Sequence, residues 1–488
     1  MSEEEKTPLR DNAIVDYAKT SKLIVADMEK NGTLNVFFKK FTKEQVRRFL
    51  ESPQASQKQL REISRFLYVS SQHYKRLVLY FSNLLLFRYY LKPIKMTIAN
   101  VDKDKLTKAY LRIADTLETM SIPHEFGKIM KTCFKEDVFY GYVLSAKDSF
   151  YIKQLDPDYC QISSVDDGVY NFKFNMQLFD NHNDLVEKYP DEFKEKYKTY
   201  KSSKKIDSWI ELDSENTICI KVEEDIIYPI PPFIGLIEAL IDLDEFKQLT
   251  KTKTKIDNYK VLTMEIPLRK ESEDNDDYVL TFDEVMKWHN FVAGNLPEMV
   301  GLISSPMPIN DINFEKDRAE TDNIAKSVRD FWAASGVNQH LFGTEKTSST
   351  GLDKSIKVDE IILFSILRQF ERWTNRRIKQ IGGNFKFFAG FLNMTEFNRN
   401  DVIKEYSELA KFGVPVKEEL CAATGLTPAD LVNKPFFELD VLNLNEKFEP
   451  LRSSHTQGDA PSGAPKVDDD ELSDEGLKTR DDEKNADD

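Results

Sequence analysis

The chain has 488 residues, a formal net charge of −15, 40% hydrophobic residues and 31% charged residues. This length provides for two or three hydrophobic cores and excludes a single small module. The acidic balance argues against a protein that reads DNA sequence, because such proteins neutralise phosphates with a basic face. The longest apolar stretch, Leu77–Phe87, is too short to span a bilayer, so we expect no membrane segment.

The four cysteines lie far apart without a CxxC pair, and the first residues are acidic where a signal peptide is basic and then apolar. Both features favour synthesis in a reducing cytoplasm. Residues 1–11 and about 457–488 are poor in apolar groups, so we expect disorder at both ends. The last part, Lys466–Asp488, holds eleven Asp and Glu against four Lys and Arg. A solvating tail is the favoured interpretation, with partner binding as the alternative.

A helical layer followed by a sheet is predicted for the first half of the chain. From Gln57 to Lys135 apolar residues recur three or four apart, which indicates helices. Alternating patterns predict strands at 150–155, 159–164 and 169–174, with Asp166-Asp167-Gly168 as a hairpin turn. The insertion at 184–205 mixes lysines and tyrosines, which suggests nucleic acid or, as we favour, an ordinary amphipathic surface helix.

A helical hairpin with a β tip is predicted next. Residues 233–260 are free of proline and indicate one long helix, followed by a strand at 261–268. After an acidic loop, residues 278–281 form a second short strand, so the two strands are expected to make a hairpin. Thr281 and Glu284 have the spacing of a capping box that opens a helix running to about Asn295.

The last third alternates helices with short strands. Strands at 299–304 and 310–315 are expected to return to the sheet, and amphipathic helices are predicted to end near Gly336 and to run from 358 to about 380. The connection 336–357 contains three glycines and is longer than a compact fold needs, which favours a loop with a moving function. A strand at 385–388 and helices at 401–412, 417–424 and 428–433 follow, with Gly413 and Gly425 as C-caps.

Catalytic motifs are absent from the sequence. It contains no GxxxxGK[ST], HExxH or GxSxG, and its six histidines are dispersed. Asp156 and Asp158 form a DxD pair, but the intervening proline favours a turn over a magnesium site. These patterns favour a structural protein over an enzyme, and we expect no cofactor and no bound metal.

Several segments resemble the portal proteins of tailed bacteriophages, of the long-tailed, siphophage type. The resemblance spans about residues 40–450 and lies mainly in the order of segments. The segments that carry it are Phe139-Tyr140-Gly141-Tyr142 with Leu155-Asp156-Pro157, Pro231-Pro232-Phe233, Ser327–Gly343, Asn375–Lys379 and Thr395–Arg399.

The resemblance implies a mainly helical α+β fold with a wing, a stem, a clip and a crown, which assembles as a ring. The implied divisions are a flexible arm (1–30), the wing (31–232), stem helix 1 (233–260), the clip (261–281), stem helix 2 (282–296), a wing return (297–335), a tunnel loop (336–357), a long helix and wing strand (358–395), the crown (396–445) and an acidic tail (446–488).

The resemblance also implies a function. Portal subunits, usually about twelve, form a ring at one capsid vertex through which double-stranded DNA is packaged, retained and ejected. The ring is a docking platform for the terminase large subunit and for head-completion or adaptor proteins, and it meets the major capsid and scaffold proteins. The implied location is the virion, with the host cytoplasm during assembly. A nuclease, or another capsid or scaffold component, remains as the alternative.

Candidate functional residues follow from this assignment, and none is catalytic. The tunnel-loop residues expected to face DNA are Lys346, Ser348, Ser349 and Lys354. The lysines expected to line the stem channel are Lys251, Lys253 and Lys255. The clip residues expected to bind partners are Lys270, Glu271, Glu273, Asp274, Asp276 and Asp277.

Overall fold

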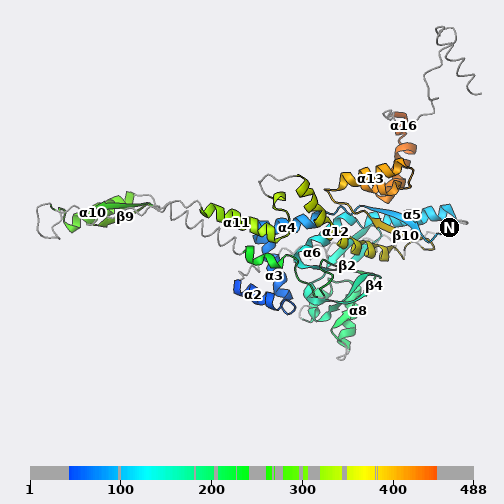
Figure 1. Ribbon diagram of the computed structural model, residues 1–488. Coiled ribbons are helices and arrows are strands. Elements are labelled where there is room, and N and C mark those ends of the chain that lie inside the picture. The colour runs from blue at the N-terminus through cyan, green and yellow to red at the C-terminus, as the bar shows by residue number, and fades with distance from the viewer. Residues whose placement is uncertain are drawn as a thin grey trace, which may run out of the picture. The chain divides into compact units, whose positions relative to one another are not determined.

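The fold is known from a computed structural model, whose elements are labelled in Figure 1. It describes residues 43–96, 101–180, 183–202, 207–226, 228–240, 260–265, 269, 279–295, 300–305, 319–342, 349–379, 381 and 383–447. The chain divides into two compact units, Met1–Leu431 and Val432–Asp488. In the described part, no helix is long and apolar enough to cross a membrane.

The first unit begins with the expected helical layer. The spacing of Leu60, Ile63 and Leu67 places all three on the buried face of α3. The helices of this layer are α2 (Lys43–Glu51), α3 (Gln57–Ser70), α4 (Gln72–Asn83), α5 (Lys103–Thr119) and α6 (Ile122–Glu136). The helical pattern did not reveal one strand within this stretch, β1 (Tyr89–Ile94). Its partner is the distant strand β10 (Lys386–Phe391), which pairs with it in antiparallel register.

Two three-stranded antiparallel sheets follow, with orders β3-β2-β7 and β4-β5-β6. The three predicted strands and the turn are confirmed: Asp167 and Gly168 have φ values of 54° and 73°, as a two-residue hairpin turn requires. The strands are β2 (Val138–Ala146), β3 (Ser149–Gln154), β4 (Cys160–Asp166), β5 (Val169–Asn175), β6 (Trp209–Glu211) and β7 (Thr217–Lys221).

The insertion forms the amphipathic surface helix that we favoured, α8 (Asp191–Ser202). Phe193 is fully buried, while Tyr197 and Tyr200 are partly buried against the same cluster. Phe174 packs edge to face on Phe193, with ring centroids 5.1 Å apart. The aromatic side of this helix therefore serves the fold. The neighbouring short elements are η3 (Pro157–Tyr159), η4 (Met176–Phe179) and α7 (Asn183–Val186).

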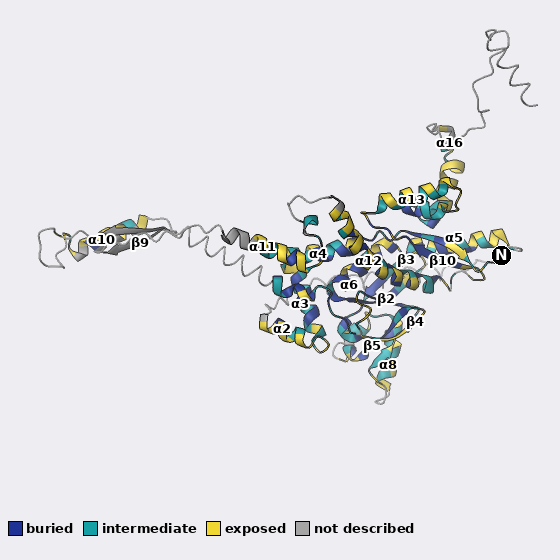
Figure 2. Cartoon of the chain, viewed as in Figure 1, coloured by how far each residue is buried: buried dark blue, intermediate teal, exposed yellow. Residues whose placement is uncertain are grey.

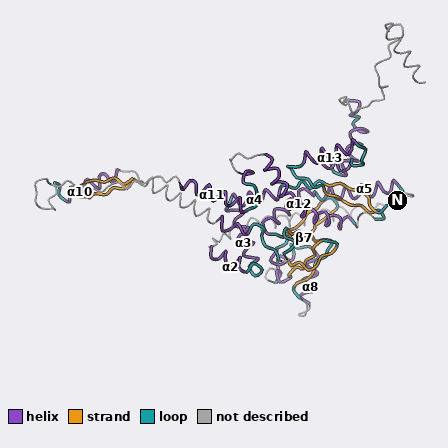
Figure 3. Tube along the Cα trace, viewed as in Figure 1, coloured by secondary structure: helices purple, strands orange, loops and turns teal. Residues whose placement is uncertain are grey.

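The central element of the first unit is the 30-residue helix α12 (Ser349–Ile378), which lies against β7 and β10 (Figure 3). Phe370 on α12 contacts Phe126 on α6 with ring centroids 4.4 Å apart, and both side chains are fully buried. Trp373, one turn further, donates its indole N–H to the carbonyl of Thr217 at 2.8 Å. Figure 2 shows buried residues along α6, β2 and α12.

The end of the first unit is a small helical cluster, α13 (Arg399–Lys411), α14 (Lys417–Thr424) and the first half of α15 (Pro428–Pro435). The predicted C-caps are confirmed, because Gly413 and Gly425 have φ values of 78° and 106°. At the start of α15, the Asp430 backbone N–H donates to Thr427 Oγ1 at 3.2 Å. In the second unit, the described residues continue through η7 (Phe436–Val441), a π-helical segment, and α16 (Leu444–Lys447).

The predicted β tip is wrong in its pairing. Strand β8 (Lys260–Glu265) pairs in parallel with β9 (Val300–Ser305), and helix α10 (Phe282–Asn295) lies between them in sequence and packs on β9 (Figure 1). Val279 and Leu280 form a bend, so no hairpin strand is present there. Parallel strands need a long crossover, which α10 supplies; α10 is thus part of this module and not the second arm of a helical hairpin.

The other expectations in this region have different outcomes. The strand predicted at 299–304 forms, but it pairs with β8 in a separate two-stranded sheet and does not return to the sheets of the core. The strand predicted at 310–315 and the helix over 241–259 lie outside the described residues. Helix α11 (Ala319–Ala334) is confirmed, and Gly336, with a φ of 73°, follows its end.

The predicted loop 336–357 is wrong in its last nine residues, because α12 already begins at Ser349. Gly351 favoured a loop, yet the helix continues through it, and Ile356 in its second turn is buried at 5% exposure. Earlier in this stretch, η6 (Gln339–Leu341) forms a short turn. Residues 343–348 lie outside the described part.

Candidate functional site

A long excursion leaves the core of the first unit and returns to it. Ile237 and Leu240 are buried in the main core just before the chain enters residues 241–259. The chain rejoins the same core through Phe331 and Trp332 of α11. Between these two points lies the β8–α10–β9 module, which has its own strand pairing. We call residues 260–305 the tip module.

The tip module exposes aromatic side chains on α10. The Thr281 backbone N–H donates to Glu284 Oε2 at 3.0 Å, and this confirms the predicted capping contact. Val285 is buried at 7% exposure, whereas Trp288 and Phe291 are 56% and 64% exposed. Their rings lie edge to face, with centroids 6.1 Å apart. Exposed aromatic residues in close contact are typical of protein-binding surfaces.

The short segment before α12 is anchored on α4. Phe342 stacks on Trp332 with ring centroids 4.4 Å apart, and Tyr80 packs edge to face on Phe342 at 5.5 Å. The Arg76 guanidinium lies 4.8 Å from the centre of the Phe342 ring. On the other side of residues 343–348, Asp359 of α12 accepts a hydrogen bond from the Tyr80 hydroxyl at 2.9 Å.

Tyr80 therefore contacts Phe342, next to residues 343–348, and also Asp359, ten residues after the start of α12. Burial raises the pKa of Asp359, and Tyr80 opposes that shift by donating its hydroxyl hydrogen. The hydrogen bond joins residues 279 apart in sequence, which local patterns do not reveal. The only local signal for these contacts was the apolar pair Leu341-Phe342 beyond the end of a helix.

A buried polar cluster fixes the segment that leads into the excursion. Asp137, with a φ of 70° beyond α6, accepts hydrogen bonds from the backbone N–H of Glu223 at 2.9 Å and of Ile230 at 3.3 Å. It also forms a fully buried ion pair with Lys221. Gln369 of α12 donates to the Lys221 carbonyl at 2.7 Å and accepts from its N–H at 3.1 Å.

This cluster joins α6, β7 and α12 to the proline-rich segment before residue 233. Burial raises the pKa of the Asp137 carboxyl, and the Lys221 ammonium opposes that shift. Removing one member of such a buried pair leaves an uncompensated charge, which is more costly than the pair itself. No local sequence pattern indicates this cluster.

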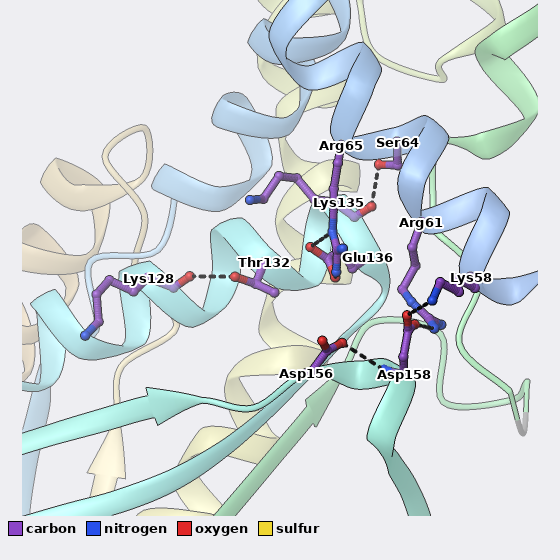
Figure 4. Close-up of polar contacts among 10 residues, drawn as sticks. All are labelled: Lys58, Arg61, Ser64, Arg65, Lys128, Thr132, Lys135, Glu136, Asp156 and Asp158. Atoms are coloured by element: carbon purple, nitrogen blue, oxygen red, sulfur yellow. Dashed lines mark hydrogen bonds and ion pairs between the residues drawn. The ribbon is translucent and has the colours of Figure 1, made fainter. Parts of the chain in front are cut away.

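A second polar network joins α3 to α6 and to η3 (Figure 4). Arg65 forms a two-bond contact with Glu136, at 2.9 Å and 2.6 Å. Arg61 and Lys58 both pair with Asp158, at 2.5 Å and 3.0 Å. Burial opposes ionisation of Glu136 and Asp158, but the facing cations outweigh it and hold the pKa of each carboxyl below its usual value.

The Asp156–Asp158 pair is therefore a turn, as predicted. Asp156 Oδ1 accepts the backbone N–H of Asp158 at 3.1 Å and caps η3, while Asp158 is held by the cations of α3. Across the described residues, no group of three His, Cys, Asp or Glu side chains is arranged to hold a metal ion.

The predicted site residues are only partly placed. Ser349 belongs to the first turn of α12, and Lys354 is exposed on the second turn, so both are helical and not in a loop. The remaining candidates lie outside the described residues: Lys346 and Ser348, the stem residues Lys251, Lys253 and Lys255, and the clip residues Lys270, Glu271, Glu273, Asp274, Asp276 and Asp277.

Comparisons with known proteins give matches among solved structures alone. No protein-family model matches the chain, and no curated protein matches it. It is similar to a chain from the neck of an empty gene transfer agent particle computed with C6 symmetry, with 11% identity and a TM-score of 0.41, over 76% of this chain and 94% of that chain.

Two further matches come from native gene transfer agent particles. A chain of the virion is 12% identical with a TM-score of 0.36, and a chain of the neck computed with C12 symmetry is 11% identical with a TM-score of 0.35. Each match covers 67% of this chain and 89% of the other. These three chains come from particle necks and a virion.

Proposed function

We propose that this chain is the subunit of a portal-type ring at one vertex of a virus capsid, through which double-stranded DNA is packaged, retained and ejected. The carrying observation is the excursion from Leu240 to Phe331, which leaves one core and returns to it with a separate βαβ module between. In the portal family the wing is followed by the stem, the clip, the tunnel loop and a long helix. In this chain the core is followed, in a similar order, by the excursion with its tip module, by residues 343–348 and by α12.

In a single copy the excursion leaves sheet edges open and buries little apolar area, and assembly into a ring provides neighbours that cover it. A two-stranded sheet has two open edges and, with one helix on it, little apolar area to bury. Copies placed side by side around an axis cover one another's flanks, and a closed ring leaves no free end. The tip module, which includes the acidic residues 271–277, then forms the docking platform for the terminase large subunit and for head–tail connector proteins.

The channel lining is assigned to residues 343–348, which lie between Phe342 and the start of α12. In a ring, residues 343–348 of all copies surround one axis, with Lys346 and Ser348 toward DNA and with Ser349 and Lys354 at the start of α12 beside them. Lys251, Lys253 and Lys255 line the stem in the same proposal. Contact with DNA is non-specific, because few cations on an acidic chain give weak phosphate binding, which suits passage.

The rest of the proposal concerns place and partners. The ring belongs to the virion and assembles in the host cytoplasm with the major capsid and scaffold proteins. No described feature favours the alternative of a nuclease, and a metal-dependent cleavage assay on purified protein separates the two functions.

A charge-reversal experiment tests the channel assignment. Lys346→Glu is expected to leave assembly unchanged and to lower DNA packaging or retention, because the lining becomes repulsive to phosphate. A matched control is Lys404→Glu, which makes the same charge change at an exposed position of α13. Normal packaging by the first variant, or an equal loss in the control, would contradict the assignment.

A further inference from the structure

Helix α12 has an apolar strip on the side that faces away from its core. Leu363, Ile366 and Phe370 are fully buried, as expected of a core-facing stripe. On the other side Val358, Ile361 and Ile362 are 61%, 68% and 46% exposed. Their spacing of three and four residues places them together on one helix face, next to the exposed Lys357. We call these four residues the outer face of α12.

The second unit presents an apolar surface of similar size. In η7, Phe436, Phe437, Leu439 and Val441 are 61%, 54%, 44% and 52% exposed. The two residues between them, Glu438 and Asp440, are acidic and exposed. The segment is held in shape by the backbone N–H of Leu442, which donates to the Phe437 carbonyl at 2.9 Å. It is therefore an ordered surface that combines apolar and negatively charged groups.

We propose that the outer face of α12 binds residues 436–441 of a second copy of this chain. Both surfaces are apolar, and their charges are complementary, because the basic Lys357 borders one and two acidic residues border the other. Complementary charge fixes register and partner choice in such contacts. Two different patches that meet between copies make a head-to-tail contact, and repetition of that contact gives a ring when the rotation between copies closes.

A second copy is favoured over a foreign partner because the two surfaces are complementary in charge and occur once each in every chain. A ring of identical copies therefore covers all of them with none left over. The inference rests on the proposed ring, and it names the surfaces by which neighbouring subunits recognise each other.

Disulfide crosslinking between differently tagged full-length copies tests the contact. Copies carrying Ile361→Cys and copies carrying Leu439→Cys, both with Cys421→Ser, are produced together and mildly oxidised. The other three cysteines, Cys133, Cys160 and Cys219, are buried. We expect a disulfide between the two kinds of copy, at about tenfold or more the yield of the control, because the contact raises the effective concentration of the thiols.

The control replaces Ile361→Cys by Val165→Cys, which introduces the thiol at a similarly exposed valine on β4 (59%). Equal yields from the two pairs would overturn the proposal. A chain carrying both Ile361→Cys and Leu439→Cys gives linked multimers if the contact joins copies. If that chain gives only an internal disulfide, the assignment to a second copy is wrong.

Charge reversal tests the recognition itself. Lys357→Glu in the first copy is expected to lower the crosslinking yield several-fold, and Glu438→Lys with Asp440→Lys in the other copy is expected to restore it. An unchanged yield with Lys357→Glu would contradict the charge pairing. Crosslinks in a sample without rings would refute the proposed function and leave the contact standing. Rings without crosslinks would refute the contact alone.

Discussion

The interior around α12 and the tip module differ in how completely they bury their apolar side chains. In the interior, Phe126, Phe370 and Trp373 are almost fully buried, and the Trp373 indole N–H is paired with the Thr217 carbonyl of the same chain. In the tip module, Val285 is buried while Trp288 and Phe291, on the same helix, are more than half exposed. The interior is complete in one copy, whereas the tip module retains apolar surface that a partner can cover.

This difference predicts that substitutions in the two regions affect different measurements. Changes in the interior lower the free energy of unfolding, because each side chain there already has its contacts. Changes on the tip module leave that free energy nearly unchanged and lower partner binding. Substitutions at Phe370, Lys221 and Glu418 test the interior or its border. Substitution of the exposed aromatic pair of α10 tests the tip module.

The largest effect is expected for Phe370→Ala. The side chain is fully buried and packs on Phe126 and Phe87, so its loss leaves a cavity at the centre of the unit. We expect the free energy of unfolding to fall by about 3–5 kcal/mol. Urea denaturation measures this change. A loss below about 1 kcal/mol would mean that the interior is loosely packed, which would remove the contrast between the regions.

A smaller loss in the free energy of unfolding is expected for Lys221→Met. This substitution keeps an unbranched side chain, one atom shorter than lysine, and leaves the buried Asp137 carboxylate without its cation. We expect a loss of about 3 kcal/mol, because a buried charge without a partner is costly. The double variant Asp137→Asn with Lys221→Met serves as the control and should recover part of the loss. No recovery would show that the ion pair is not the source of the effect.

A pH-dependent effect is expected at Glu418 on α14, which packs on β1. Burial and the neighbouring Glu419 raise the pKa of Glu418 to about 7, although the Leu91 N–H opposes this shift. The folded state then holds a proton that the unfolded state releases between about pH 4.5 and 7. This group therefore adds stability at low pH, and the added stability is lost as the pH rises through 7.

The comparison of wild type with Glu418→Gln isolates this contribution. The free energy of unfolding of the wild type, minus that of the variant, is expected to be larger at pH 5.5 than at pH 8. Denaturation at both pH values gives the difference, and the other titrating groups cancel because both proteins share them. A difference that does not change with pH would contradict a raised pKa.

The smallest effect on stability is expected for Trp288→Ala with Phe291→Ala. Both side chains are exposed, so we expect the free energy of unfolding to change by no more than about 0.5 kcal/mol. Assembly or adaptor binding should fall in pull-down assays. Val165→Ala, at an exposed valine of β4, is the control for both measurements. Normal binding by the double variant would show that the aromatic pair has no partner.

Local patterns predicted the elements whose determinants are local. The turn at Asp167-Gly168, the caps at Gly413 and Gly425, and the amphipathic face of α8 each depend on neighbouring residues, and all are confirmed. The pairing of β1 with β10, and that of β8 with β9, depends on contacts distant in sequence, so the sequence alone missed the first and misassigned the second. The start of α12 was misplaced because Gly351 and the polar run 347–350 indicated a loop.

The candidate site was predictable to a lesser extent. The segment before α12 was identified from its glycines and polar residues, but its anchoring by Tyr80, Phe342 and Asp359 depends on three elements brought together by folding. Exposed residues such as Ile361 and Trp288 could not be distinguished from core residues by periodicity, because the burial of a helix face is a property of the folded chain.

Assembly state is the most direct test of the proposed function. Light scattering coupled to size exclusion, with imaging of the same fractions, gives both the mass and the symmetry of the purified protein. The proposed function predicts closed rings, and twelve copies of 56.6 kDa weigh about 680 kDa. A single monomer peak at micromolar concentration, unchanged between low and high salt, would contradict it.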